Sequence, residues 1–301
     1  MHQFIFKQLI IIILAILPAM VNGQGTARYE PVPLPGSQLR NFRSEVLERD
    51  LRICVQLPLD YDPQREEKYP VLYVTDGNRF FPLVANISTV LGFPPSGFPQ
   101  VVVVGIAYEI ESMADWAVWR TLDLTPTVHP ETEQNWEGIL SRLTGVENWN
   151  VRTGGAAAFL EFITSELIPF IESEYHVSSG DRALAGYSYG GLFTMYALFA
   201  QPDAFQRYFA GSPSLYYDSD VTYRIEEEYA GTHDDLPGKL FLSFGELEGD
   251  YMLGHLARMD SVLRSRAYPN LEVSSHVFAG EEHRSCCPAA VMRAFRVLYG
   301  E

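Results

Sequence analysis

The segment LAGYSYGGLFTMYALFA (residues 184–200) decides the fold, because it places one serine between two glycines where two patterns meet. The residues before Ser188 form a short apolar run typical of a buried strand, and those after it have a helical pattern. A G-x-S-x-G motif between a strand and a helix predicts a sharp turn that exposes the serine hydroxyl. We therefore predict that Ser188 is a nucleophile. The alternative is a serine that only caps the following helix.

Strand and helix patterns alternate on both sides of this motif. Residues 37–61 predict two antiparallel strands joined near Glu48–Asp50, and the nearly all-apolar runs at 69–77 and 98–108 suit strands buried on both faces of a sheet. Further strands are predicted over 181–188, 207–213, 239–245 and 271–280, and helices over 78–92, 154–175, 190–200, 220–229, 252–266 and 289–300. This order predicts an α/β fold with a mostly parallel, twisted sheet of about eight strands and helices on both faces.

Residues 108–153 do not fit the alternation. They contain all four tryptophans of the chain, among prolines, threonines and acidic residues. A long stretch without clear periodicity is usually either functional or disordered, and this aromatic content argues against disorder. We expect an insertion that forms a cap or faces the substrate.

Composition and the N-terminus restrict the class of protein. The formal net charge of −16 leaves no basic surface for nucleic acid or an anionic membrane. Lys7, the apolar run 9–17 and the small residue Gly23 form the pattern of a secretory signal peptide, and the run is shorter than the roughly 20 residues that span a bilayer. We expect residues 1–23 to be removed, 24–301 to form a single domain without a membrane anchor, and the protein to be periplasmic or extracellular.

Three cysteines, Cys54, Cys286 and Cys287, have no spacing that suggests a zinc site. We expect them to be structural or free, and we expect no metal and no organic cofactor. The sequence leaves the oligomeric state open.

A nucleophilic serine needs a base and an acid, and after a motif of this kind their chain order is acid, then histidine. His283 follows the last predicted strand, in a loop from which it could reach Ser188. The turn after strand 239–245 offers three carboxylates, Glu246, Glu248 and Asp250, of which the position of Glu248 fits best.

Acyl transfer also needs two N–H groups that face the developing oxyanion. The backbone amide of Tyr189 directly follows the nucleophile. The second is expected in the loop after the strand at 69–77, where we favour the amide of Asn78, with Gly77 as second choice.

The segments YVTDGNRFF, VVVVGIAY, RTLDLTPT, LAGYSYGGLFTMYALF, SFGELEGDY and FAGEEHRS occur in the order seen in a known family. Over residues 35–300 the chain resembles the esterase family of α/β-hydrolases that includes enterochelin esterase-like siderophore esterases. S-formylglutathione hydrolases and feruloyl esterases are similar to it more distantly. The resemblance implies an α/β-hydrolase fold, a Ser188–Glu248–His283 triad and Asn78 as the second oxyanion donor. It also implies that Cys54 lies far from Cys286 and Cys287, which disfavours a disulfide between them.

The segment RTLDLTPT (120–127) resembles the siderophore esterases in particular. There Arg120 could meet a carboxylate or catecholate of the substrate, although a structural clamp between Arg120 and Asp123 is equally compatible. The aromatic content nearby suits an aromatic ester, and Trp119 is the residue that we expect to contact it.

These observations predict an exported serine esterase that cleaves a small-molecule carboxylic ester through an acyl-enzyme. The expected substrate is a siderophore trilactone or another aromatic ester. The alternatives are a carbohydrate-linked feruloyl or acetyl ester, or a non-catalytic siderophore-binding protein on a hydrolase scaffold.

Overall fold

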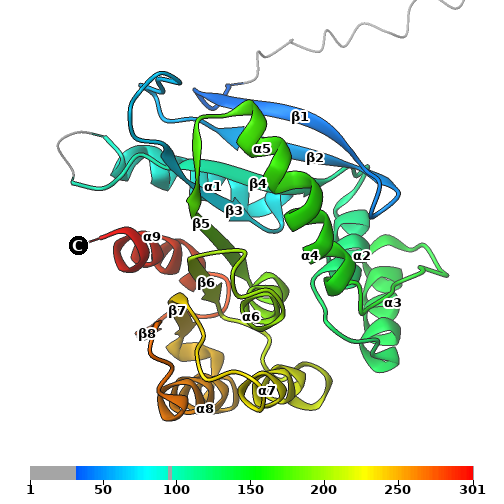
Figure 1. The fold of residues 1–301 in the computed structure, drawn as a ribbon. Coiled ribbons are helices and arrows are strands. Elements are labelled where there is room, and N and C mark those ends of the chain that lie inside the picture. Colours follow the sequence, from blue (N-terminus) through cyan, green and yellow to red (C-terminus); the bar gives the residue numbers. More distant parts are fainter. Residues whose placement is uncertain (1–31, 94–96, 301) are drawn as a thin grey trace, which may run out of the picture. The chain divides into compact units, whose positions relative to one another are not determined.

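The apolar runs of the sequence form one sheet. A computed structural model describes residues 32–93 and 97–300, so the predicted signal peptide lies outside the described residues. In this part of the chain, eight strands pair in the order β1-β2-β4-β3-β5-β6-β7-β8 (Figure 1). Their bounds are β1 Ser37–Ser44, β2 Arg49–Gln56, β3 Tyr69–Val74, β4 Val102–Tyr108, β5 Val177–Tyr187, β6 Arg207–Gly211, β7 Gly238–Gly245 and β8 Leu271–Phe278. Strand β2 is antiparallel to both of its neighbours, β1 and β4. The remaining strands, β3 through β8, are all parallel to one another, which confirms the predicted sheet.

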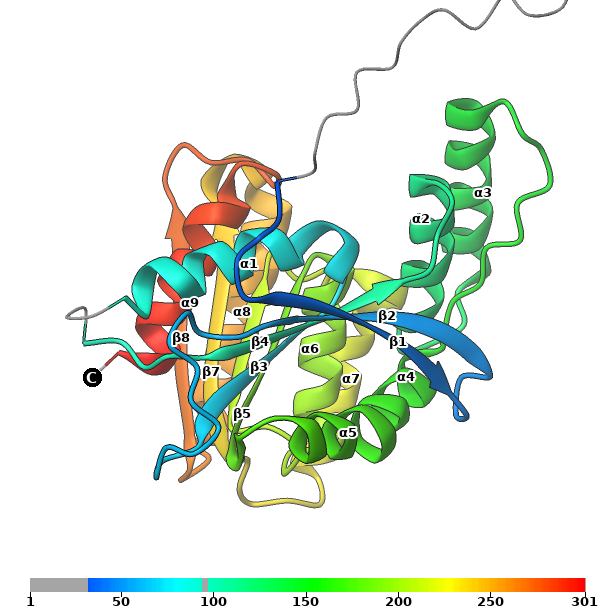
Figure 2. The same cartoon turned by 90° about the horizontal axis from the view of Figure 1, so that it is seen from above.

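Side chains alternate along the central strands and fill two cores, one on each face of the sheet. In β3, Val71 and Tyr73 belong to one core, and Leu72 and Val74 to the other. Figure 2 shows the sheet between α1 and α9 on one side and α5 and α6 on the other. The helices that cover the sheet are α1 Gly77–Leu91, α4 Ala156–Phe162, α5 Ile168–Glu174, α6 Tyr189–Ala200, α7 Tyr217–Ala230, α8 Asp250–Arg266 and α9 Cys286–Tyr299. Burial on both faces explains why the parallel strands are nearly all apolar.

The helix predicted over 154–175 is interrupted. A π-helical turn, Ile163–Leu167, separates α4 from α5, and Pro169 lies at the start of α5. Proline has no N–H to donate and crowds the carbonyl four residues earlier, so the regular hydrogen-bond ladder cannot continue through this point.

The insertion contains two helices that the sequence pattern did not reveal, α2 (Met113–Asp123) and α3 (Pro130–Thr144). Ser112 and Asp115 form a capping box at the start of α2, and the His129 ring caps α3. In α3 only Leu140 is buried, so there is no apolar stripe to detect. Figures 1 and 2 show α2 and α3 beside each other, away from α1 and α9.

The carboxyl ends of β3 through β8 meet at one edge of the sheet, because these strands are parallel. The segments that carry Asn78, Ser188, Glu248 and His283 all leave from this edge. Cys54, Cys286 and Cys287 are free thiols. In the described part of the chain, no helix has both the length and the apolarity needed to cross a membrane.

Candidate active site

Ser188 lies in a strained turn between β5 and α6. Its backbone dihedral angles are φ 60° and ψ −117°, a combination that side-chain-bearing residues rarely adopt. The flanking glycines are required by close contacts. A Cβ on Gly186 would lie 2.0 Å from the Gly190 carbonyl oxygen, and one on Gly190 would lie 2.4 Å from Oγ1 of Thr75. This is the geometry of a nucleophile elbow, in which the serine hydroxyl stands clear of the sheet.

Glu248 and His283 contact each other at the neighbouring strand ends. His283 Nδ1 lies 2.7 Å from Glu248 Oε2. The other carboxylate oxygen accepts hydrogen bonds from the Gly245 amide and the Ser212 hydroxyl, each at 2.7 Å. The Glu248 side chain is 3% exposed, whereas that of His283 is 41% exposed. The acid is thus buried behind the imidazole, and the imidazole reaches solvent.

Hydrogen bonding keeps Glu248 ionised despite its burial. Burial alone raises the pKa of this carboxyl, but the hydrogen bonds from His283, Gly245 and Ser212 lower it by more, so the net pKa lies below the usual range. A carboxylate can only accept, so Nδ1 of His283 donates to it. The Nε2 atom is then free to accept a proton, as a general base must.

Ser188 and His283 line the same open pocket, which is also lined by Glu248, Ser214, Tyr216, Leu247, Met252 and Glu282. Of the three carboxylates considered from the sequence, Glu248 is the one that contacts His283. Glu246 instead accepts a hydrogen bond from the Gly280 amide, and Asp250 begins α8.

The two predicted oxyanion donors lie at the starts of two helices that cover opposite faces of the sheet. Tyr189 is the first residue of α6, and Asn78 is the second residue of α1, where backbone N–H groups have no partner within the helix. Strands β3 and β5 are paired, so the two helix starts lie on adjacent strand ends. The Asn78 side chain exchanges two hydrogen bonds with the backbone of Tyr108, which fixes this turn.

Arg120 is not among the residues that line the pocket with Ser188. Its guanidinium donates two hydrogen bonds of 2.9 Å to Asp76, and both side chains are buried. It also lies 4.7 Å from the ring of Trp116 and 5.1 Å from that of Tyr189. A clamp therefore exists, but its acid is Asp76 and not Asp123. The expectation that Arg120 binds substrate is not supported, because its charge is already paired inside the protein.

Trp119 is also placed differently from the expectation. Its ring lies 4.3 Å from the guanidinium of Arg49, which pairs with Asp123, and it lines a separate pocket with Tyr108. Another tryptophan contacts the elbow, since Nε1 of Trp136 donates to the Tyr189 hydroxyl at 3.3 Å. The sequence could not identify this residue, because α3 has no pattern that predicts its orientation.

Two further residues near the site were not predicted, Ser212 and Tyr187. Ser212 donates to Glu248, and the Tyr187 hydroxyl lies 2.7 Å from both Ser212 Oγ and the His283 carbonyl oxygen. A sequence signal existed for Ser212. It follows a parallel strand that lies between those of the nucleophile and the acid, and therefore ends at the same edge.

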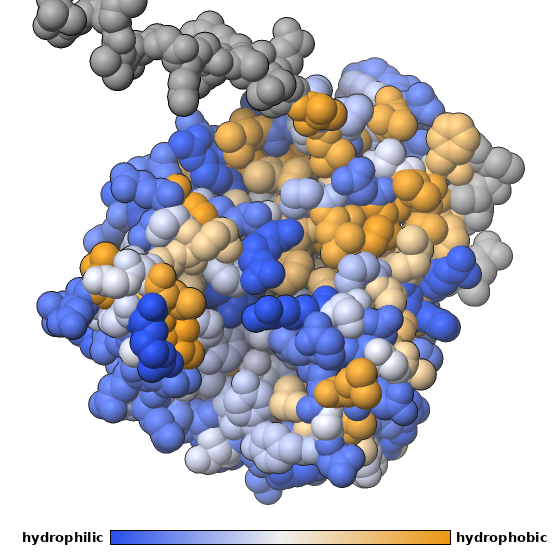
Figure 3. Space-filling view, turned by 180° about the vertical axis from the view of Figure 1, so that it is seen from behind, coloured by the Kyte–Doolittle hydropathy of each residue, from blue (hydrophilic) through white to orange (hydrophobic). Residues whose placement is uncertain are grey.

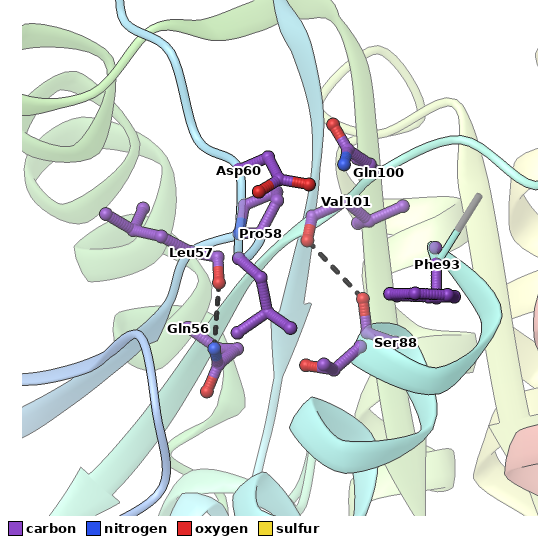
Figure 4. Close-up of a pocket in the computed structure, with 11 residues that line it drawn as sticks. Gln56, Leu57, Pro58, Asp60, Ser88, Phe93, Gln100 and Val101 are labelled. Carbon is purple, nitrogen blue, oxygen red and sulfur yellow. Dashed lines mark hydrogen bonds between the residues drawn. The ribbon is translucent and has the colours of Figure 1, made fainter.

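A different pocket lies at the opposite, amino-terminal edge of the strands. Figure 4 shows Gln56 and Leu57, at the end of β2, near Ser88 of α1 and Val101, which precedes β4. Leu59 and Phe93, which also line it, are among the exposed large apolar residues. On the face shown in Figure 3, apolar side chains gather toward the upper right, and hydrophilic ones cover much of the rest. The pocket lined by Gln56 and Leu57 contains no histidine, and it is not part of the candidate active site.

Comparison with known proteins agrees with this geometry. A family model described as "Putative esterase" matches residues 44–254. The chain is 30% identical to the ferri-bacillibactin esterase BesA of Bacillus subtilis over 275 residues, which cover 87% of this chain and 89% of that protein. It is 29% identical to the siderophore triacetylfusarinine C esterase of Aspergillus fumigatus over 304 residues, or 90% and 96% of the two chains.

Solved structures give the same result. The BES protein from Bacillus cereus superposes with a TM-score of 0.77 at 26% identity, over 91% of this chain and 98% of that one. An IroE-like serine hydrolase from Shewanella oneidensis superposes with a TM-score of 0.73 at 27% identity, over 87% and 80%. The predicted α/β-hydrolase fold is confirmed, and the chain belongs to this esterase family as a serine hydrolase.

Proposed function

We propose that the protein hydrolyses the ester bonds of a siderophore trilactone, or of another aromatic ester, through an acyl-enzyme on Ser188. The observation that carries the chemistry is the 2.7 Å contact between His283 Nδ1 and the buried Glu248, in the pocket that Ser188 also lines. The substrate class is supported by the names of the relatives. Ferri-bacillibactin, triacetylfusarinine C and enterobactin esterases all resemble this chain.

In the proposed mechanism, His283 removes the proton of Ser188 as the hydroxyl oxygen attacks the ester carbonyl. The backbone amides of Tyr189 and Asn78 stabilise the oxyanion. As the carbon–oxygen bond to the alcohol breaks, the imidazolium protonates the leaving oxygen. Water, deprotonated by His283, then attacks the acyl-enzyme and releases the acid and free Ser188. Glu248 holds the imidazole and balances its positive charge.

The test compares the wild type with Ser188→Ala and His283→Ala on a p-nitrophenyl ester and on a panel of siderophore, feruloyl and acetyl-sugar esters. We expect both variants to lose more than about a thousandfold in kcat. An unchanged rate in either variant would contradict the assignment of Ser188 as nucleophile and His283 as base. A wild type that prefers feruloyl or acetyl-sugar esters would instead support the carbohydrate-linked alternative.

We also propose that the protein is exported, on the basis of its N-terminal pattern alone. Expression in a bacterial host with N-terminal sequencing of the secreted or periplasmic fraction tests this. The mature chain is expected to begin at Gln24. Full-length protein that stays with the cytoplasm would contradict the proposal.

A further inference from the structure

A continuous row of hydrogen bonds crosses four neighbouring strand ends at the site. It runs from Tyr187 at the end of β5 to Ser212 after β6, to Glu248 after β7, and to His283 after β8. The contacts Tyr187–Ser212, Ser212–Glu248 and Glu248–His283 each measure 2.7 Å. Tyr187 closes the ring, because its hydroxyl also lies 2.7 Å from the His283 carbonyl oxygen.

Proton counting assigns a direction to each bond. The Glu248 carboxylate only accepts, so the Ser212 hydroxyl must donate to it. The proton of Ser212 is then used, and Tyr187 has to be the donor in the contact between the two hydroxyls. Tyr187 also donates to the His283 carbonyl, so its single proton serves two acceptors. Burial raises the pKa of Tyr187 well above its usual value, so this proton is retained near neutral pH.

The inner part of the row, Tyr187 and Ser212, is shielded from solvent, whereas the His283 imidazole at its end is 41% exposed. Ser212 is fully buried, and Tyr187 is 5% exposed. Two buried thiols lie near Tyr187, those of Cys286 and Cys287. Burial raises the pKa of Cys286 to about 11 and that of Cys287 to about 12, so both stay uncharged near neutral pH. Buried polar groups are costly to leave unpaired, and a connected network with each member bonded holds one geometry.

Two backbone features indicate that this arrangement is maintained at a cost. Ser212 has φ 38°, a left-handed conformation that glycine would adopt without strain. The preceding residue, Gly211, has to be glycine, because a Cβ there would lie 2.5 Å from the Tyr187 ring. The Tyr187 ring in turn lies 5.3 Å from the His283 imidazole, so one side chain contacts both the ring and the carbonyl of this histidine.

We propose that Tyr187 and Ser212 are positioning residues, which hold His283 and Glu248 in the geometry and charge state that activate Ser188. Ser212 acts on the acid by stabilising its carboxylate, and Tyr187 acts on the base by fixing its main chain and its ring. This inference rests on the proposed function of Ser188, and its test must separate the two.

The first test is Tyr187→Phe, which keeps the ring and removes the hydroxyl. Tyr208→Phe is the matched control, because the Tyr208 hydroxyl is also buried and also donates to a backbone carbonyl, that of Pro202, outside the site. The readout is the rate at which a fluorophosphonate labels the protein, which reports serine activation without knowledge of the substrate. We expect about a tenfold slower reaction for Tyr187→Phe, because small misplacements of reacting groups cost one to two orders of magnitude, and an unchanged rate for Tyr208→Phe.

The second test pairs Ser212→Ala with Ser212→Gly. Both remove the hydroxyl, but only glycine relieves the backbone strain. We expect glycine to give the higher Tm and both variants to label about tenfold more slowly. Losing a donor makes Glu248 a more basic partner of His283, so the acid limb of the rate–pH profile is expected to move to higher pH. In the double variant Tyr187→Phe/Ser212→Ala, the loss is expected to be smaller than the product of the single losses.

The proposal is overturned if Tyr187→Phe labels like Tyr208→Phe, or if Ser212→Gly labels at the wild-type rate with an unshifted profile. Either result would limit the row to a structural role. A different result would contradict the proposed function itself: the wild type would not be labelled, or Ser188→Ala would be labelled as fast as the wild type.

Discussion

At the residue scale, Glu248 receives three hydrogen bonds and is the acid in contact with His283. We predict that Glu248→Gln lowers kcat by about three to four orders of magnitude with little change in KM, because glutamine no longer balances the imidazolium or selects the correct tautomer. Steady-state kinetics on a p-nitrophenyl ester measure this.

The control for this change is Glu246→Gln. Glu246 lies in the same turn but contacts the Gly280 amide, so we expect this variant to keep most of the activity. A Glu248→Gln enzyme within tenfold of the wild type, or a Glu246→Gln enzyme that is equally impaired, would contradict the assignment of the acid.

Asp123 provides a residue-scale prediction for stability. Burial raises its pKa from 3.8 to about 6, although Arg49 next to it acts in the opposite direction. Between these two values the folded state binds more protons than the unfolded state, so stability falls as the pH rises through this window. We predict that the Tm of the wild type decreases from about pH 4 to about pH 6 relative to that of Asp123→Asn. Thermal melts in which the two proteins keep a constant difference across this range would refute the prediction.

At the element scale, one ion pair connects α2 to both candidate oxyanion donors. Arg120 of α2 binds Asp76, which directly precedes Gly77 and Asn78, and its guanidinium packs on the ring of Tyr189. We predict that Arg120→Met destabilises the fold by about 3–5 kcal/mol, because it leaves a buried carboxylate unpaired. It should also lower kcat by about tenfold or more, since the donors lose their support.

Arg266→Met is the matched variant for Arg120→Met. Arg266 makes the same bidentate contact with the buried Glu226, but between α8 and α7. Denaturant unfolding should show a loss of stability in both variants, whereas kinetics at a temperature where both are folded should show a loss of kcat in Arg120→Met alone. Equal kcat values in the two variants would show that α2 does not act on the site.

Most elements could be predicted because their residues carry local patterns. The parallel strands are buried on both faces and appear as apolar runs, and α6 is apolar all round because it packs between the sheet and other helices. Helices α2 and α3 could not be predicted in this way. The start of α3 combines an uncommon histidine cap with Pro130 in the first turn, a residue that often begins helices, but the helix is polar on most of its surface and has no apolar stripe to mark it.

At the scale of the whole molecule, the position of the candidate site followed from topology. Once the strands are parallel, the residues after β3, β5, β7 and β8 must share one edge, so Asn78, Ser188, Glu248 and His283 could be selected by chain order. The partners of Arg120 and Trp119 could not be selected. Asp76 and Arg49 lie far from them in sequence, and only the packing of α2 on the sheet brings them together.

The role of Tyr187 could not be predicted from the topology either. Its neighbour Ser188 is identified by the glycines around it, whereas Tyr187 acquires partners only when β6 and the loop after β8 are placed beside it. A tyrosine at the end of a buried strand has no local pattern that distinguishes a core residue from a hydrogen-bond donor.

The most direct test of the central claim is mass spectrometry of a trilactone siderophore incubated with the wild type or with Ser188→Ala. We predict that the wild type converts the trilactone into a product that has gained one water, with one ester opened, and that Ser188→Ala leaves it intact. An intact trilactone after incubation with the wild type, or equal hydrolysis by Ser188→Ala, would contradict the account.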